Sequence, residues 1–584
     1  MDNLPKESDA LKIKKTDALL TILQMPMIKY MMRHFYRSPQ LADADVGTFR
    51  KYVHKNDPFE MEPVTFDSPK SNVRSIAASK QAKVFYAQRN YPHALEKFNE
   101  AICWAEGTDS EHLALCYANR SVIYYDVKEY EFCLANIALA KKHNYPRKSL
   151  QKLLNREASC KQKIAKGLSQ LALVCPSLAM DDKIRHPTRP FMADEIIQKE
   201  LPGYGRGLVA ERDFKVGEVI LQEKAWLATN SAGSKYTNCN HCSVDNFRSL
   251  IPCPKCVSVM YCSEKCLNEG WKYSHRFECG ISDKIHHMSH DKCRYLMGVR
   301  TFFYGLTLFK DDLDEMMKFC ETNGRTGADP LNLDYTNLDP LEEFKIFHKT
   351  KRPIGLSSHD EILRLYAAVY HAVYCRNPRV RSIIKNDNHK DFMLRTILDY
   401  MRMIDFLVIH NRQRFSNHLF TIASVCNHSC DPNVISVIYY GLLKFIVIRP
   451  IPAGQQILIS YGPLAIRIDS HEVRSRILSK FQFKCICDSC DAVKRRNKEN
   501  AISSARPVPE DYIDKVNLVM KDKSASGEVK INTVKDCIQQ LVASYPGKQY
   551  NNLVHNYQNM LEFTYFKGAQ DALRSAAHKV VSDN

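Results

Sequence analysis

The chain has 584 residues, a formal net charge of +18 and 45% hydrophobic residues, an ordinary apolar content for a folded globular protein. A chain of this length exceeds one hydrophobic core, so we expect three or more packed units. It lacks a run of about 18 apolar residues, and its polar start argues against a secretory signal. We therefore expect a cytoplasmic and nuclear protein without a membrane span, whose 21 cysteines are thiols or metal ligands.

Part of the positive charge is concentrated in residues 147–166 and in the run KRRNK at 494–498. The first segment is interpreted equally well as a solvated helix face or as a contact for nucleic acid. The second is a candidate nuclear import signal, although such runs are common on loops. The hypothesis of direct nucleic-acid binding rests on charge alone, and net charge acts only as a long-range attraction for polyanions. It predicts a steep loss of affinity with salt.

An internal repeat occupies residues 76–168, after an N-terminal extension of residues 1–70. Small and aromatic residues recur 39 positions apart; the matched pairs are Ala82 and Ser121, Phe85 and Tyr124, Tyr91 and Tyr130, Ala94 and Cys133, Phe98 and Ile137, and Ala101 and Ala140. The tetratricopeptide (TPR) period is 34, and the loop EGTDSEH accounts for the excess. We predict TPR-like antiparallel helices that dock a peptide, capped by a degenerate helix over 150–166.

Residues 185–238 change to short apolar runs between glycine-rich turns, as in PGYGRGLVAERDFKVGEVILQE, and this pattern predicts β-hairpins. Helical patterns return in 281–410, strand patterns in 411–465 and helical patterns in 501–584. The predicted fold class is α+β with several domains. One β-rich domain is interrupted by a cysteine-rich insertion and by a helical insertion, between the N-terminal repeats and a C-terminal helical domain.

The cysteine-rich insertion, residues 239–279, reads C-x2-C-x10-C-x2-C-x5-C-x3-C-x8-H-x3-C. Seven cysteines and one histidine supply two tetrahedral zinc sites with no ligand left over. The regular spacing disfavours free buried cysteines. Spacing alone does not say which pairs share an ion.

A third cluster lies in residues 466–492, where Cys485, Cys487 and Cys490 form a C-x-C-x2-C pattern. Three thiolates need a fourth ligand. Cys430, in the stretch CNHSCDPN at 426–433, is a suitable donor because no other cysteine or histidine follows the cluster before His555. Asn427 and His428 of the same stretch are then left for another role.

The cysteine-rich insertion, with Tyr261 before Cys262 and Trp271 before HRFEC, resembles a MYND finger. MYND fingers bind short, often proline-rich peptides, and they cross-brace their metal ligands. The resemblance implies that one zinc ion is held by Cys239, Cys242, Cys262 and Cys266. It implies that a second zinc ion is held by Cys253, Cys256, His275 and Cys279.

From about residue 76 to 490 the chain resembles the SMYD family of SET-domain protein lysine methyltransferases, in its TPR-bearing subgroup. The shared motifs, in family order, are GYGRGLVA, the finger, NHSCDPN, GQQILISYGP and the C-x-C-x2-C tail. The resemblance implies a SET domain formed by residues 185–238 and 411–465, followed by a post-SET zinc segment. It implies S-adenosylmethionine as cofactor, three zinc ions, and a monomer that acts on a lysine side chain of a protein substrate.

Methyl transfer to lysine requires a neutral amine, although the free pKa is near 10.4. An apolar channel and the adjacent sulfonium charge both lower that pKa, so alignment is needed more than a strong base. The resemblance implies Tyr461 as the catalytic residue, whose hydroxyl orients the amine. It implies a cofactor pocket formed by Tyr204, Gly205, Arg206, Gly207, Asn427, His428, Tyr461, Phe481 and Phe483. Taken singly, these motifs are also typical of a hairpin turn, a capping turn and packed aromatics.

The chain also departs from the family. The departures are Phe481 in place of a tyrosine, Gln455 and Gln456 in place of acidic residues, Cys426 in place of an aliphatic residue, Tyr204 in place of a lysine, and VIHNRQRF at 408–415 in place of the usual CN-x-F. Two hypotheses therefore remain. One is an active methyltransferase whose repeats and finger capture a client. The other is a SET–MYND scaffold that recruits transcriptional or chaperone partners.

A finer hypothesis concerns the repeats. Some TPR pairs bind the C-terminal carboxylate of chaperones through basic and amide side chains. Lys83, Asn119 and Arg120 could form such a clamp if they share the concave face. Solvated polar residues on helical repeats are the more common case.

Overall fold

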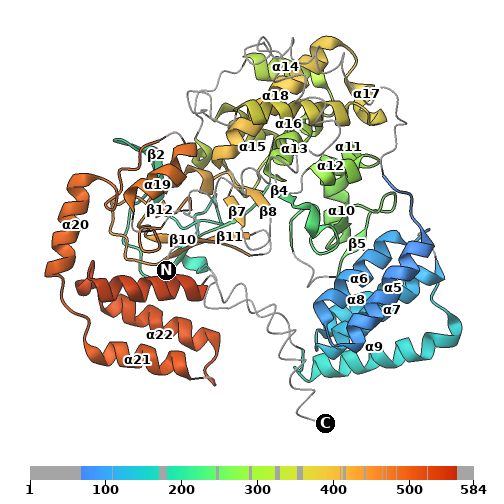
Figure 1. Ribbon diagram of the computed structural model, residues 1–584, viewed down its shortest axis with the longest axis horizontal. Coiled ribbons are helices and arrows are strands. Elements are labelled where there is room, and N and C mark those ends of the chain that lie inside the picture. The colour runs from blue at the N-terminus through green and yellow to red at the C-terminus, as the bar shows by residue number, and fades with distance from the viewer. Residues whose placement is uncertain are drawn as a thin grey trace, which may run out of the picture.

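The computed structural model describes residues 67–561, except 108–109, 170–179, 245–248, 289–292, 323–328, 351–359, 412–415, 440–441 and the single positions 408, 463, 469, 482 and 523. Most of the predicted N-terminal extension and the last part of the C-terminal domain lie outside the described residues, as does most of the VIHNRQRF segment. The described chain combines helices with several small sheets (Figure 1). The mixed helix and strand composition of the predicted fold class is confirmed.

Five helices, here called the helical array, come first. They are α5 (Asn72–Ala87), α6 (Tyr91–Trp104), α7 (Glu111–Asp126), α8 (Tyr130–Lys142) and α9 (Leu150–Ala165). Side chains of Ser71 and Ser110 cap α5 and α7 by accepting backbone N–H groups of Arg74 and Leu113. Ala82, Ala101 and Ala140 of the repeat are fully buried, which lets neighbouring helices approach closely. Helices therefore occur where the repeat predicts them.

The cysteine-rich segment 239–279, here called the finger, contains β5 (Ile251–Pro252), β6 (Met260–Tyr261), α10 (Glu264–Gly270) and α11 (Arg276–Glu278). It lies directly beside the helical array (Figure 1). Buried side chains from the array and from the finger belong to one hydrophobic cluster. The two segments therefore share a core, although the sequence suggested separate modules.

The strands of the predicted β-rich domain form four sheets. Their members are β1 (Ile196–Leu201) with β2 (Gly205–Ala210); β10 (Val434–Tyr439), β11 (Leu442–Val447) and β3 (Val219–Lys224); β4 (Leu227–Asn230), β8 (Ser416–Leu419) and β7 (Ile409–Asn411); and β9 (Asn427–His428) with β12 (Leu458–Ile459). All pairings are antiparallel except that of β9 with β12, which is parallel. Asn427 is opposite Leu458 and His428 is opposite Ile459. This pairing brings NHSC beside the strand that leads into Tyr461.

The helical insertion forms its own apolar core above these sheets (Figure 1). Its helices are α12 (Ser282–Met288), α13 (Cys293–Leu308), α14 (Leu313–Thr322), α15 (Pro340–Lys349), α16 (Asp360–Tyr374), α17 (Pro378–Ile383) and α18 (Asp387–Leu407). Gly298 and Gly305 of α13 are placed where a Cβ would lie 2.7 Å from the side chain of Met401 and 2.2 Å from that of Phe344. The glycines allow α13 to pack closely against α18 and α15.

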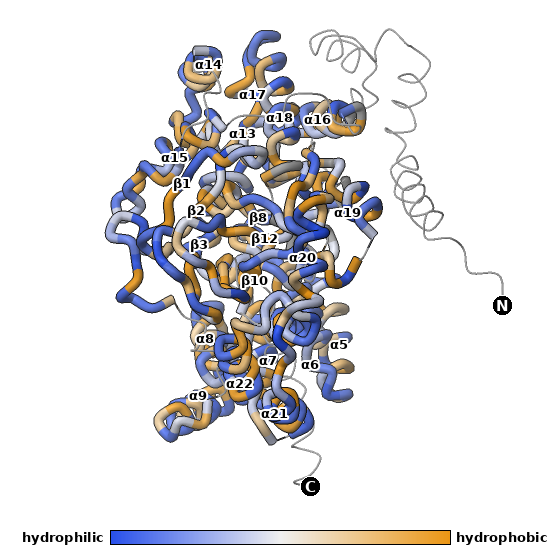
Figure 2. The backbone as a smooth tube through the Cα atoms, turned by 90° about the vertical axis from the view of Figure 1, so that its left-hand side faces the viewer, coloured by the Kyte–Doolittle hydropathy of each residue, from blue (hydrophilic) through white to orange (hydrophobic). Residues whose placement is uncertain are grey.

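The C-terminal part contains α19 (His471–Leu478), α20 (Ala492–Ser504), α21 (Glu510–Lys521), α22 (Gly527–Gln540) and a helical stretch at 548–561. Its apolar residues pack on Ile435, Val437 and Ile446 of the β10–β11 hairpin. Helix α20 carries KRRNK, has no buried residue and is largely hydrophilic in Figure 2. Among the described residues, no helix is both long and apolar enough to cross a membrane.

Candidate active site and metal centres

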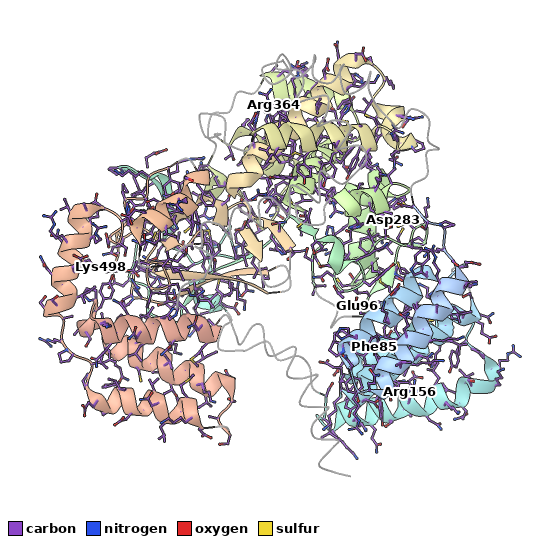
Figure 3. All side chains as sticks on the ribbon, in the orientation of Figure 1. Phe85, Glu96, Arg156, Asp283, Arg364 and Lys498 are labelled. Atoms are coloured by element: carbon purple, nitrogen blue, oxygen red, sulfur yellow. The ribbon has the colours of Figure 1, made fainter. Side chains whose placement is uncertain are left out.

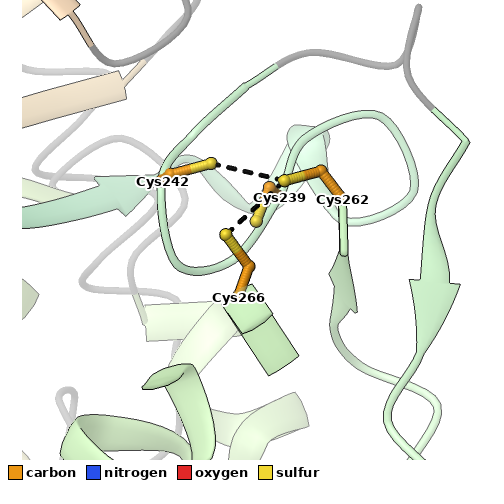
Figure 4. Close-up of side chains that lie close together, drawn as sticks. All are labelled: Cys239, Cys242, Cys262 and Cys266. Carbon is orange, nitrogen blue, oxygen red and sulfur yellow. Dashed lines mark hydrogen bonds between the residues drawn. The ribbon is translucent and has the colours of Figure 1, made fainter. Parts of the chain in front are cut away.

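The structure brings the twelve predicted metal ligands together in three sets of four. In the first set, the sulfur atoms of Cys239, Cys242, Cys262 and Cys266 all lie within 4.8 Å of one another (Figure 4). The Sγ atom of Cys262 is 3.6 Å from that of Cys242 and 3.5 Å from that of Cys266. Two thiolates on one tetrahedral zinc ion are about 3.8 Å apart, given Zn–S bonds near 2.3 Å. The donor set and its spacing therefore fit zinc.

The second set, Cys253, Cys256, His275 and Cys279, lies deeper in the finger. His275 Nε2 is 3.3 Å from Cys253 Sγ and 3.4 Å from Cys256 Sγ, and the histidine is fully buried. The two finger sets alternate along the chain, so each site closes a loop that contains half of the other. This grouping is the cross-braced one that the family resemblance implies.

The third set joins Cys430 to Cys485, Cys487 and Cys490, and all four are buried. Cys430 Sγ is 3.5 Å from Cys490 Sγ. Arg474 of α19 donates a 2.7 Å hydrogen bond to the Ser489 carbonyl, and its guanidinium is 3.7 Å from Cys490 Sγ. A cation at this position offsets the negative charge of four thiolates. Thiolate donors in a closed, buried set are typical of a structural zinc site.

The glycine-rich turn meets the NHSC segment at Gly207. A Cβ atom at this position would lie 2.5 Å from Asn427 Nδ2 and 2.7 Å from Gln456 Oε1, so only glycine fits without displacing them. The Asn427 amide donates to the Arg206 carbonyl at 2.8 Å and to Gln456 Oε1 at 2.7 Å. The turn, the NHSC segment and the strand before Tyr461 are thus tied together at one point.

His428 connects Tyr461 to the third cysteine set. Its Nδ1 accepts the backbone N–H of Tyr461 at 3.0 Å, which places the ring proton on Nε2 in the neutral tautomer. Nε2 then donates toward Cys430 Sγ, 3.3 Å away. The imidazole is 2% exposed, and burial is the main reason that its pKa is lowered to about 4. His428 is therefore a neutral spacer between a metal ligand and the candidate catalytic residue.

Three aromatic rings gather at this spacer. The ring of Tyr461 is centred 5.3 Å from His428, 5.0 Å from Phe481 and 6.2 Å from Phe483. The Tyr461 hydroxyl donates to the Cys426 carbonyl at 2.7 Å, and burial raises its pKa. The hydroxyl therefore stays protonated at neutral pH, and its remaining lone pairs can accept. Phe483 is 39% exposed and borders solvent.

Of the remaining predicted cofactor residues, Tyr204 lies in the β1–β2 turn and Gly205 is the first residue of β2. Gly205 has φ +71°, a conformation that favours glycine. Burial raises the pKa of Tyr204, and the turn lies against the third cysteine set, because a Cβ on Gly203 would lie 2.6 Å from Ile486 Cδ1. Arg206 is held through its backbone carbonyl, as described above. The structure therefore brings Gly207, Asn427, His428, Tyr461, Phe481 and Phe483 closely together, and it places Tyr204 beside the metal ligands.

Sequence reasoning missed two residues that organise this site. Asn433, the last residue of CNHSCDPN, donates to the Gln456 carbonyl and accepts the Leu458 N–H, both at 2.9 Å. Glu223 of β3 accepts the backbone N–H groups of residues 421–423 at 2.7, 2.9 and 2.8 Å. Burial raises the pKa of Glu223 to about 7. Asn433 could have been found from its place in the motif, whereas nothing local marks Glu223.

The predicted carboxylate clamp of the repeats needs a correction. Arg120 is fully buried, and its guanidinium donates to the Leu250 carbonyl and to Ser249 of the finger at 2.8 Å each. An outside carboxylate therefore cannot reach it. Lys498 of KRRNK, labelled in Figure 3, also has a structural partner, because it forms an ion pair with Asp431 of CNHSCDPN.

Comparisons with known proteins agree with this geometry. The SET domain family matches residues 205–462. The protein-lysine N-methyltransferase SMYD4 of Danio rerio is 21% identical over 531 residues, which cover 76% of this chain and 68% of the relative. SMYD4 of Homo sapiens is 23% identical over 592 residues, covering 79% and 73%. The N-lysine methyltransferase SMYD2 of Gallus gallus is 22% identical over 301 residues, covering 51% and 60%.

Proposed function

We propose, from the premise that the chain is a SMYD4-like SET–MYND protein, that it is an S-adenosylmethionine-dependent protein-lysine N-methyltransferase. The observation that carries the proposal is the placement of Tyr461. Its backbone is held by His428 and its hydroxyl by the Cys426 carbonyl, within a group of aromatic rings. The substrate is a lysine side chain of a protein, histone or non-histone.

The pocket fits the cofactor on two grounds. The absence of a side chain at Gly207 lets the glycine-rich turn lie directly against Asn427 and Gln456, so the turn and the NHSC segment lie together where the cofactor would bind. Aromatic faces at Tyr461, Phe481 and Phe483 suit a cationic sulfonium group. When bound, S-adenosylmethionine supplies an electrophilic methyl group. Arg206, Gly207, Asn427 and His428 would hold it.

The chain's own residues then act on the lysine amine. The partly buried phenyl ring of Phe481 keeps water from the inner side of the site, which disfavours the ammonium form, and Phe483 forms the solvent edge. The hydroxyl oxygen of Tyr461, whose proton is committed to the Cys426 carbonyl, presents lone pairs that accept weak hydrogen bonds from the amine or a methyl group. The reaction requires this alignment more than it requires a base.

Three zinc ions would complete the protein, two in the finger and one beside the site. The third ion would fix Cys430, whose thiolate accepts from His428 Nε2. His428 is then held in the tautomer and orientation that support the backbone of Tyr461. The ion would therefore affect the geometry of the site and would not contact the reacting atoms.

A scaffold without turnover is the second candidate, and two observations favour it. Both hydrogens of the Asn427 amide are already engaged inside the protein, by the Arg206 carbonyl and by Gln456. Phe481 also lacks the hydroxyl that the family usually has at this position. Under this proposal the finger recruits transcriptional or chaperone partners.

Partners and location are further proposals. We propose TPR-like character for the helical array, peptide binding by an outer surface of the finger, a monomeric state, and residence in both cytoplasm and nucleus. Nucleic-acid binding would use the exposed cations of α20, such as Arg495 and Arg496. A steep salt dependence of affinity would support it.

The test uses labelled S-adenosylmethionine and a cell extract. Wild-type protein is compared with Tyr461→Phe and with Tyr512→Phe, a control whose hydroxyl donates to Gln540 on the C-terminal helices. Labelled bands that appear with wild type and the control but vanish with Tyr461→Phe support the enzyme. Absence of both labelling and saturable cofactor binding would overturn it in favour of the scaffold.

A further inference from the structure

The strongest unexplained feature outside the candidate site is the guanidinium of Arg120 on α7. It is fully buried, and in the part of the chain that the structure describes its recorded partners are neutral. Nε donates to Asn136 Oδ1 at 2.7 Å, and Nη1 donates to Asn99 Oδ1 at 2.5 Å. Burial lowers the pKa of Arg120. Burying a cation without a carboxylate partner costs free energy, so hydrogen bonds to well-placed neutral acceptors must offset that cost.

The other acceptors come from the finger, about 130 residues further along the chain. Nη1 donates to the Leu250 carbonyl and Nη2 to Ser249 Oγ, both at 2.8 Å. The two asparagines contact the finger and the residues just before it. Asn136 donates to Ser249 Oγ at 2.9 Å, and Asn99 donates to the Tyr236 carbonyl at 2.9 Å. Helices α7 and α8 thus supply Arg120 and Asn136 to residues 249–250, while Asn99 of α6 accepts from Arg120 and reaches Tyr236, which precedes the finger.

These contacts are those of a peptide-binding site. Backbone carbonyls and one serine hydroxyl are the groups recognised, and Ile251 and Pro252 continue the stretch as strand β5. The apolar side of the contact is equally shared. Leu250, Val257, Val259 and Met260 are buried in the same cluster as Phe98, Ile102 and Tyr117 of the array. The array therefore meets residues 249–252, of sequence SLIP, as it would meet a bound peptide.

Peripheral contacts extend the interface at both ends. Lys142 of α8 forms a 3.0 Å ion pair with Glu264 of α10. The carboxylate of Asp67, before α5, accepts the backbone N–H groups of Gly280 and Asp283 at 2.8 and 2.7 Å. The array thus contacts the finger also at α8, and Asp67, just before the array, contacts the residues that directly follow the finger.

We propose that the helical array is a docking site for this chain's own finger. Residues 249–252 are its ligand, and Arg120 recognises them by hydrogen bonding. The site formed by Asn99, Arg120 and Asn136 is consequently filled in cis and does not serve an outside peptide. The array stabilises the folded finger, so the two segments behave as one rigid unit. This inference is independent of methyl transfer, because none of its residues lies in the candidate active site.

The experiment measures amide hydrogen exchange in the full-length protein. Arg120→Met removes the guanidinium but keeps a long side chain. Arg156→Met is the matched control, because Arg156 on α9 donates to Ala118 and Ser121 within the array (Figure 3). The reporter is the peptide spanning 249–261, whose amides include Cys253 N–H bonded to the Val259 carbonyl. Peptides from α13 serve as an internal reference.

Arg120→Met is expected to speed exchange in 249–261 by at least about tenfold, the effect of losing charge-assisted hydrogen bonds. Arg156→Met and the α13 peptides should stay within about twofold of wild type, a factor that corresponds to a few tenths of a kcal/mol in opening energy. Unchanged protection of 249–261 in Arg120→Met would overturn the proposal. Equal acceleration of exchange by both arginine variants would also overturn the proposal. A loss of stability of the array, and not the loss of its contact with the finger, would then explain the faster exchange.

A second variant covers the case in which Arg120→Met unfolds the array itself. Ser249→Ala leaves every array residue in place but removes the hydroxyl that accepts from Arg120 and Asn136. Faster exchange in 249–261 with unchanged exchange in α5 and α7 supports docking. Wild-type exchange in this variant, together with collapse of the array in Arg120→Met, would refute it.

Discussion

The ion pair between Arg300 of α13 and Glu278 of the finger gives the sharpest prediction on stability. Nε and Nη2 of Arg300 donate to the two carboxylate oxygens at 2.7 and 2.8 Å, and the side chains are 2% and 3% exposed. Tyr374 adds a 3.0 Å hydrogen bond to the same carboxylate. Arg300 also donates to the Ala228 and Asn240 carbonyls, so it joins the finger, a SET strand and the helical insertion.

Arg300→Met leaves a fully buried carboxylate with one hydroxyl donor. Burial by itself raises the pKa of Glu278, but Arg300 outweighs burial and holds the pKa below its usual value. Removing one partner of a buried pair costs about 3–5 kcal/mol. Adding Glu278→Gln removes the stranded charge, and we expect this second change to recover about 2 kcal/mol through the coupling between the two sites.

Urea unfolding followed by tryptophan fluorescence measures this cost, because Trp226 and Trp271 lie in this part of the molecule. The control is Arg402→Met, which breaks the more exposed pair with Asp360 and should cost about 1 kcal/mol or less. The reasoning is refuted if Arg300→Met loses no more stability than the control. It is also refuted if the double variant is as unstable as Arg300→Met alone.

Three further predictions follow from the candidate site. Gly207→Ala drives a Cβ into Asn427, so calorimetry should show at least a tenfold loss of cofactor affinity, whereas Gly233→Ala, with no atom within 4 Å, should bind normally. The folded-state pKa of Glu223, about 7 against 4.5, means that the folded protein retains a proton which the unfolded chain has lost. Stability should therefore fall by up to about 3 kcal/mol as pH rises from 4.5 to 7, and Glu223→Gln should flatten that slope in pH-dependent unfolding. In Cys430→Ser, metal analysis should show the loss of one zinc equivalent while the zinc of the finger is retained, and methyl transfer should be lower. Unchanged methyl transfer would contradict the role given to His428.

The metal ligands were predictable from sequence because their spacing is short and regular. Cys430 was also predictable, although it lies far from residues 485–490, because the incomplete C-x-C-x2-C set demanded a fourth thiolate. The strand and helix classes followed from periodicity in the same way. These are inferences from local pattern or from a counting rule, which do not require knowledge of tertiary packing.

Long-range polar contacts were not predictable in this way. Arg120 looked like a surface residue of a repeat, and its burial depends on Ser249 and Leu250, which no local pattern connects to it. Gln456 looked like a loss relative to the family, yet its side-chain oxygen accepts from Asn427 as a carboxylate would. Glu223 gave no signal because its partners are backbone N–H groups. Such contacts depend on which chain segments meet, and a single sequence does not encode that in its periodicity.

The parallel pair of β9 and β12 has a kinetic consequence. Its two residue pairs are 31 positions apart in the chain, Cys430 meets Cys490 across 60 positions, and the Asn427 amide meets the Arg206 carbonyl across 221 positions. Contacts of such sequence separation form late, because loop closure must precede them. The residues around Tyr461 are therefore among the later parts of the protein to assemble. A nascent chain still emerging from the ribosome would carry a folded helical array well before the residues around Tyr461 come together, and it would stay inert until the cysteines near residue 490 had emerged.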